Sequence, residues 1–235
     1  MFCHRCGANV APDTKFCQAC GQPLHMQGSP GGPPPVSPQP APFTLTGDGK
    51  ARTGAWIGEG WSIVKSDMGT FALMTLVMVA LSATVPVILQ GPLTAGFQIA
   101  MIHRILRGRV EFGDLFKGFN FFLPAMLASL VISVFTFLGL LACLVPALVV
   151  QAMYFFTYLF IVDRKMDFWP AMQASHEIVK KDYFGFTLLL LAFAGLHVLG
   201  VLCCLVGILW TFPIQYAALT IAYKEIVGFH STSFD

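Results

Sequence analysis

Charged residues are scarce in this chain, and three long stretches contain none. Only 11% of its 235 residues are Asp, Glu, Lys or Arg, whereas a soluble domain has about 25%. The charge-free runs are residues 68–103, 118–162 and 183–223, which are 36, 45 and 41 residues long. One bilayer crossing takes about 20 residues. Each run is therefore too long for one membrane span and long enough for two.

The chain also lacks a large net charge and a signal peptide. Its formal net charge is only +2, which argues against nucleic acid as a partner. The first residues contain no apolar segment followed by a small-residue cleavage site. We therefore expect the N-terminus to be retained in the cytoplasm.

Four cysteines near the N-terminus form two copies of one motif, F-C-x-x-C-G, which begin at Phe2 and Phe16. Two C-x2-C pairs ten residues apart are typical of a tetrahedral zinc site. Iron in a rubredoxin-like site is the alternative. Four cysteine ligands leave no open position for catalysis. The motif predicts a β-type zinc ribbon at residues 1–24 with one structural Zn²⁺, whose ligands are Cys3, Cys6, Cys17 and Cys20.

Composition predicts three further segments. Residues 25–50 contain seven prolines and five glycines, so we expect a disordered linker that buries no core. The charge-poor residues 51–228 are the predicted membrane domain. Residues 229–235 are the predicted cytoplasmic tail.

The membrane domain resembles three copies of one helical hairpin. Residues 138–146 match residues 199–207 at an offset of 61. The pairs His103-Arg104, Asp163-Arg164 and Tyr223-Lys224 lie 60 residues apart, and each pair closes a charge-free run. The expected fold class is an all-α membrane bundle of six transmembrane helices, at 70–88, 92–106, 122–143, 146–162, 184–203 and 206–223.

A short amphipathic helix is expected before each hairpin. The first carries an apolar stripe of Ile57, Trp61, Val64 and Met68. Similar stripes start at Phe112 and Phe168. Helices of this kind suit a membrane interface, although they could also be the ends of the spans.

Charge predicts the orientation of the hairpins. All twelve Lys and Arg from residue 50 onward lie at the ends opposite the hairpin tips. Positively charged ends stay on the cytoplasmic side. We therefore expect a multi-pass protein of the cytoplasmic (inner) membrane with both termini in the cytoplasm. Cys143, Cys203 and Cys204 lie at two tips, where either a disulfide or small residues in a tight turn would explain them.

Few polar side chains remain inside the expected spans, and none is charged, which argues against an ion pathway. Hydrogen bonds between helices explain them more simply than a site does. They are Gln98, His103, Gln151, Tyr154, Tyr158, His197, Gln215 and Tyr216.

The motifs resemble those of bacterial membrane proteins. Residues 1–24, with Gly7 and Gly21 directly after the C-x2-C pairs, are similar to the zinc-ribbon head on many of them. Residues 55–228 resemble six-span membrane families of unknown function, one of which forms the membrane part of some glycerophosphodiester phosphodiesterases. The shared features are the Cys-Leu-Val-Pro turn that ends at Pro146 and the Asp163-Arg164 step. No phosphodiesterase domain is present, so that activity is not expected here.

Together these features predict a non-enzymatic membrane protein that acts as an adaptor or assembly factor. Its expected partners are membrane lipid and a cytoplasmic protein bound by the head, and homo-oligomers are left open. The alternative is a transporter or channel for a small or amphipathic solute. A lipid-handling intramembrane enzyme is a third hypothesis. A polar groove between the repeats would favour transport, whereas a closed bundle of Leu and Phe would favour the adaptor.

Overall fold

The computed structural model describes residues 46–47, 49–84, 86–142, 144–202 and 207–230. The chain divides into two units, Met1–Ala41 and Pro42–Asp235, and all described residues belong to the second. The predicted zinc ribbon with its four cysteines lies outside the described residues. So do most of the predicted linker and the tip cysteines Cys143, Cys203 and Cys204.

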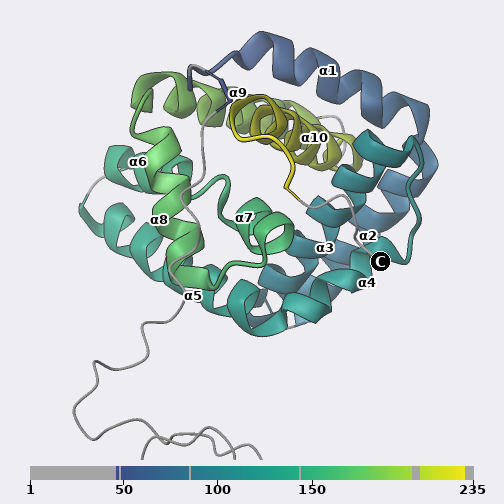
Figure 1. The fold of residues 1–235 in the computed structure, drawn as a ribbon, viewed down its shortest axis with the longest axis horizontal. Helices are drawn as coiled ribbons and strands as arrows, with labels where there is room; N and C mark the ends of the chain where they lie inside the picture. The colour runs from purple at the N-terminus through teal and green to yellow at the C-terminus, as the bar shows by residue number, and fades with distance from the viewer. Residues whose placement is uncertain (1–45, 48, 85, 143, 203–206, 231–235) are drawn as a thin grey trace, which may run out of the picture. The chain divides into compact units, whose positions relative to one another are not determined.

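The described residues of the second unit form helices and no strand, which confirms the expected all-α class for this part of the chain (Figure 1). A short 3-10 helix, Gly118–Phe121, joins α4 to α5. The α-helices in chain order are α1 (Thr53–Ser66), α2 (Met68–Thr84), α3 (Pro86–Arg107), α4 (Asp114–Lys117), α5 (Phe122–Ala142), α6 (Leu144–Met153), α7 (Thr157–Arg164), α8 (Phe168–Val179), α9 (Tyr183–Leu202) and α10 (Ile208–Ile226).

Helix ends lie close to each expected hairpin tip, between α2 and α3, between α5 and α6, and between α9 and α10. The second arm of the middle hairpin differs from the expectation, because a turn at residues 154–156 divides it into α6 and α7. The sequence contains no proline or glycine at this turn, so the usual markers of a helix break are missing.

Three helical stretches are long and apolar enough to cross a membrane: Asp114–Leu141, Pro146–Arg164 and Tyr183–Leu202. The pair Thr53–Ser66 and Met68–Thr84, bent by 100°, makes a fourth if it counts as one span. Within the most apolar 18-residue window of each stretch, only 17% of the residues are buried in the first stretch and 22% in the third. Their exposed apolar side chains therefore suit a lipid environment.

The helices α3 and α10 are outside this set, and they are also the buried centre of the unit. Residues 91–103 of α3 and 216–223 of α10 are buried without interruption. Helix α10 packs against α1, α2, α3 and α9, and α3 also packs against α5 and α7. Helices covered by protein need not be apolar on every side. The polar residues that lower the hydropathy of α3 and α10 therefore do not argue against a membrane location.

Helix α1 packs along α10 and not through the stripe expected from its sequence. Its buried residues are Trp56, Gly60 and Val64, while Trp61 is 42% exposed. Gly60 lets the helices approach, since an added Cβ would lie 3.1 Å from the backbone nitrogen of Ala218. The Trp56 indole also donates a 2.8 Å hydrogen bond to Glu225 on α10. The face of α1 that packs on α10 therefore contains Gly60 and not the neighbouring Trp61 of the apolar stripe.

Contacts of the bundle extend beyond the limits expected for the membrane domain. The Thr46 backbone N–H donates to the carbonyl oxygen of Ile226 at 2.8 Å. At the other end, Phe229 packs against the core, and the His230 N–H donates to the Asp163 carboxylate at 3.1 Å. Both chain segments that flank the bundle thus meet it near the end of α10.

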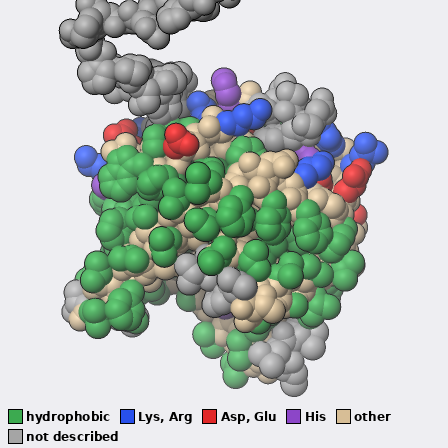
Figure 2. All heavy atoms as spheres, turned by 90° about the horizontal axis from the view of Figure 1, so that it is seen from below, with side chains coloured by type: hydrophobic (Ala, Val, Ile, Leu, Met, Phe, Trp, Pro, Cys, Tyr) green, Lys and Arg blue, Asp and Glu red, His purple; other side chains and the backbone are tan. Residues whose placement is uncertain are grey.

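Charged side chains gather at one edge of the unit on the face that Figure 2 shows, and hydrophobic side chains cover most of the rest of that face. The salt bridges lie among residues at these helix ends, as between Arg104 and Asp67 at 2.7 Å. His103 and Asp114, both buried, are paired at 3.0 Å. The distribution places the charge away from the hairpin tips, as the sequence predicts.

Glycines allow the closest packing in the unit, where α3 meets α4, the 3-10 helix and α5. A Cβ on Gly96 would collide with the backbone carbonyl of Leu115, and one on Gly118 would collide with the carbonyl of Pro92. A Cβ on Gly91 would meet the carbonyl of Ala125. Small residues at such contacts are typical of helix packing in membranes.

We predict that Gly96→Ala lowers the unfolding temperature of the detergent-solubilised protein. The added methyl group forces the backbone of α4 away, and overpacking of this kind costs about 1–3 kcal/mol. The matched control is Gly195→Ala on α9, where an added Cβ meets nothing within 4 Å. This control should equal or exceed the wild type, because alanine favours helix by up to ~1 kcal/mol. Equal unfolding temperatures for the two variants would contradict the packing described.

Candidate functional site

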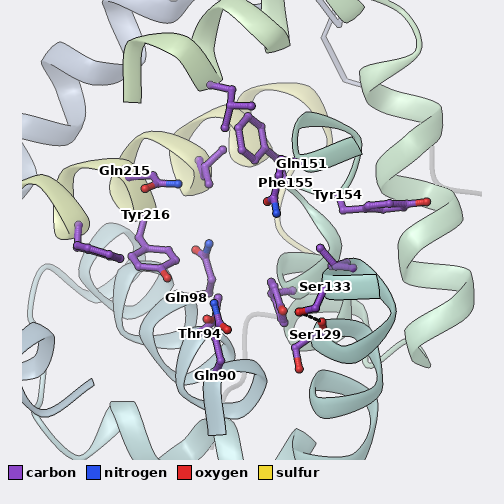
Figure 3. Close-up of a pocket in the computed structure, with 15 residues that line it drawn as sticks. Gln90, Thr94, Gln98, Ser129, Ser133, Gln151, Tyr154, Phe155, Gln215 and Tyr216 are labelled. Carbon is purple, nitrogen blue, oxygen red and sulfur yellow. Dashed lines mark hydrogen bonds between the residues drawn. The ribbon is translucent and has the colours of Figure 1, made fainter. Parts of the chain in front are cut away.

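A polar cavity of about 250 Å³ lies between α3 and α10 on one side and α5 and α6 on the other (Figure 3). Of its fifteen lining residues, ten have polar side chains and none is charged. The polar lining residues are Gln90, Thr94, Gln98, Ser129, Ser133, Gln151, Tyr154, Tyr158, Gln215 and Tyr216. The cavity therefore gathers four of the five glutamines between residues 50 and 230.

Each wall of the cavity is one stripe of a helix. Gln90, Thr94 and Gln98 recur every four residues and so lie on one face of α3. Ser129 and Ser133 have the same spacing on α5 and lie opposite that stripe in Figure 3. Except for Gln90, which lies near the start of α3, these positions are in the middle of long helices and away from the charged helix ends. The cavity is thus at mid-depth in the bundle.

Hydrogen bonds hold part of the lining in place. The Thr220 hydroxyl lies 2.7 Å from Gln98 Oε1, which links α10 to α3. The Gln151 amide donates to the hydroxyl of Thr136 on α5 at 2.9 Å. Ser133 donates to the carbonyl oxygen of Ser129 at 2.7 Å. The two bonds between helices join neighbours on the same side of the cavity, α3 with α10 and α5 with α6.

Burial along the walls shows which end of the cavity is open. On α3, Gln90 is exposed, whereas Thr94 and Gln98 are 7% and 1% exposed. On the antiparallel helix α5, Ser133 is exposed and Ser129 is 3% exposed. Exposure therefore increases toward the hairpin tips on both walls. The cavity opens toward the tips and ends before the charged edge.

An aromatic cluster fills the bundle between the cavity and the charged edge. Tyr223 is fully buried, and its ring lies 5.2 Å from that of Phe160 and 6.4 Å from that of Phe156. The Tyr223 hydroxyl donates to Asp163 at 3.0 Å. The same carboxylate accepts the backbone N–H of His230. The C-terminal segment thus contributes to the closed end of the cavity.

The structure brings together six of the eight polar residues that the sequence singled out. His103 and His197 are not among the lining residues. His103 pairs with Asp114, and His197 Nδ1 lies 2.7 Å from the carbonyl oxygen of Phe193 in its own helix. Tyr154 lines the cavity with its ring, but Figure 3 shows its hydroxyl turned away.

Four polar lining residues were missed by the sequence reasoning: Gln90, Thr94, Ser129 and Ser133. Gln90 falls between two expected spans, and serine and threonine are common in helix interiors, where they bond to the preceding turn. The spacing of 90, 94 and 98 could have identified the α3 stripe. No sequence pattern would have placed it opposite α5.

The described residues contain no group of three or more His, Cys, Asp or Glu that could hold a metal ion. The predicted zinc ligands are in the first unit, outside those residues. A model of the zinc-ribbon domain matches residues 2–24, a range that includes Cys3, Cys6, Cys17 and Cys20. No curated protein and no solved structure matches the chain. The chain thus carries an N-terminal zinc-ribbon domain, which implies zinc binding, together with helices apolar enough for a membrane.

We predict that the purified full-length protein contains one zinc ion per chain. Structural zinc contributes an apparent ~10–16 kcal/mol to the folding of small zinc domains. Cys6→Ser should therefore abolish zinc binding, measured by elemental analysis, and leave the helical circular dichroism of the second unit unchanged. Cys203→Ser, outside the motif, is the matched control and should retain zinc. A zinc content well below one per chain, or iron in its place, would show the prediction to be wrong.

Proposed function

We propose that this protein is a non-enzymatic integral membrane protein whose helical unit takes up a small solute in its central cavity, as a transporter or channel. The polar, uncharged cavity at mid-depth carries the proposal. Polar side chains inside a membrane bundle are costly unless they find partners. Sites at this depth, between structural repeats, are typical of transporters.

The cavity supports transport over the adaptor function for the helical unit. A bundle that serves only as an anchor can fill its interior with Leu and Phe. Here four glutamine side chains line a space of about 250 Å³. The open end at the hairpin tips also gives a solute a route to that space.

Six spans and a repeated hairpin remain part of the proposal, and two observations support them. The burial of α3 and α10 explains why helices that are less apolar can still cross the bilayer. A matching small-residue contact also recurs 61 residues apart. A Cβ on Gly139 would lie 3.0 Å from Ala147, and one on Gly200 would lie 3.0 Å from Gly207. Both contacts join the two arms of a hairpin.

We predict that both termini and the two charged loops lie on the cytoplasmic side of the inner membrane. Reporter fusions at residues 25, 110, 166 and 235 should all report the cytoplasm, because positively charged segments are retained there. Fusions at 110 and 166 are the most informative, since they follow the first and second proposed hairpins. An external signal at either position would exclude the three-hairpin topology.

The zinc-ribbon head favours a second candidate function, recruitment of a cytoplasmic protein. The zinc-ribbon match covers residues 2–24. If all four cysteines bind the zinc ion, no coordination position is left for a substrate, so the zinc is structural. A flexible tether raises the effective concentration of whatever the head binds near the membrane. In this proposal the head recruits the partner and the helical unit handles the solute.

Deletion of residues 1–24 separates the two candidate functions. Proteoliposomes with the full-length protein should take up at least one small solute faster than empty vesicles. We predict that the deletion leaves this uptake and the unfolding temperature of the bundle nearly unchanged, because the cavity lies wholly within the second unit. Co-purification of a cytoplasmic protein should be lost. Absence of uptake for every solute would exclude transport, and unchanged co-purification would exclude recruitment by the head.

A further inference from the structure

The chemistry of the cavity wall restricts what it can hold. Its amide groups both donate and accept hydrogen bonds, and so do its hydroxyl groups. None of its lining residues can balance a charge. An ion taken into a low-dielectric site without a counter-charge loses much of its hydration energy. The wall therefore suits a neutral solute that itself carries several donors and acceptors.

Two glutamines present unused hydrogen-bonding groups to such a solute. Among the described residues, no hydrogen bond occupies the side-chain amides of Gln90 on α3 and Gln215 on α10, two neighbouring helices on the same side of the cavity. Gln90 is exposed near the open end, and Gln215 is half-buried deeper in the bundle. Buried or half-buried amides without partners are unfavourable in an apolar medium. A bound polar molecule would satisfy both groups.

The volume of the cavity limits the solute to a small one. At about 30 Å³ for each water in the liquid, roughly eight water molecules would fill 250 Å³. This is slightly below the ~300–1,000 Å³ of sites for drug-sized ligands. Lipid chains and long sugars are too large, whereas a three- or four-carbon polyol fits.

We propose that the cavity binds a small uncharged solute with several hydroxyl groups, such as a short polyol. This inference rests on the proposed function, because it names the class of solute that the same cavity takes up. Gln90 on α3 and Gln215 on α10 bind hydroxyl groups of the solute. Discrimination against ions follows from the missing counter-charge, and discrimination against disaccharides and larger solutes follows from the volume.

The test is light scattering of proteoliposomes that contain the full-length protein, after a hyperosmotic shock with one solute at a time. Glycerol and erythritol should enter faster than in empty vesicles, whereas sucrose and potassium chloride should not. Gln215→Leu and Gln90→Leu should each raise the half-saturating glycerol concentration about three- to tenfold, the effect of losing one uncharged hydrogen bond. Gln173→Leu, on the exposed face of α8, is the matched control and should leave it unchanged.

The outcomes distinguish this inference from the proposed function. Entry of potassium chloride or sucrose without glycerol would overturn the solute class and leave transport standing. Equal half-saturating concentrations for Gln215→Leu, Gln90→Leu and wild type would overturn the role of the two amides. Retained unfolding temperatures for both variants would show that lost uptake reflects the site and not the fold. No accelerated entry of any solute would overturn both this inference and the transport function.

Discussion

Polar side chains on membrane-length helices must find partners inside the protein, and the arrangement of the second unit depends on this constraint. Lipid offers no hydrogen bonds, so the glutamines of α3 and α10 can be placed only toward other helices. The apolar helices α5 and α9 expose most of their surface, while α3 and α10 are covered on most sides. The most polar helices thus become the centre of the bundle, and the polar stripes they share with α5 and α6 face one another across the cavity.

Close packing of the backbone determines where the cavity can lie. Gly91, Gly96 and Gly118 bring the backbone of α3 into direct contact with α4, the 3-10 helix and the first turns of α5. Helix α1 is held equally close to α10 at Gly60. On the side where α10 faces α5 and α6, large polar residues replace the small ones. A hydrogen bond from Thr220 to Gln98 joins α10 to α3 beside the cavity. Glycines of α1, α3 and the 3-10 helix thus allow close backbone contact on one side of α3 and α10, whereas glutamines line the cavity on the other side.

The helices of the second unit could largely be predicted from the sequence, because charge-free runs and hairpin breaks are local patterns. Most of the polar lining residues were also recognised, since a glutamine in an apolar run is conspicuous. Their assembly into one cavity was not predicted, because Gln98, Gln151 and Gln215 come from three hairpins whose packing is not encoded in any local spacing. The division of α6 from α7 was missed because proline and glycine are both absent there. The face of α1 that packs on α10 was not predicted: Val64 belongs to the apolar stripe in its sequence, whereas the buried Trp56 and Gly60 do not.

The two ends of the cavity differ in chemistry: aromatic side chains lie at one end, and polar, uncharged side chains lie at the other. At the closed end, Tyr223, Phe160 and Phe156 fill the space, and the Asp163 carboxylate joins α10 to the C-terminal segment. The segment that precedes α1 meets the bundle in the same region, through Thr46 and Ile226. At the open end, polar walls lead toward hairpin tips that carry no charge. In the transport function proposed above, a neutral solute enters from the tips without passing a charged group. The aromatic cluster would then have to move for the solute to reach the charged edge, and the Asp163 carboxylate buried beside this cluster also accepts the backbone N–H of His230.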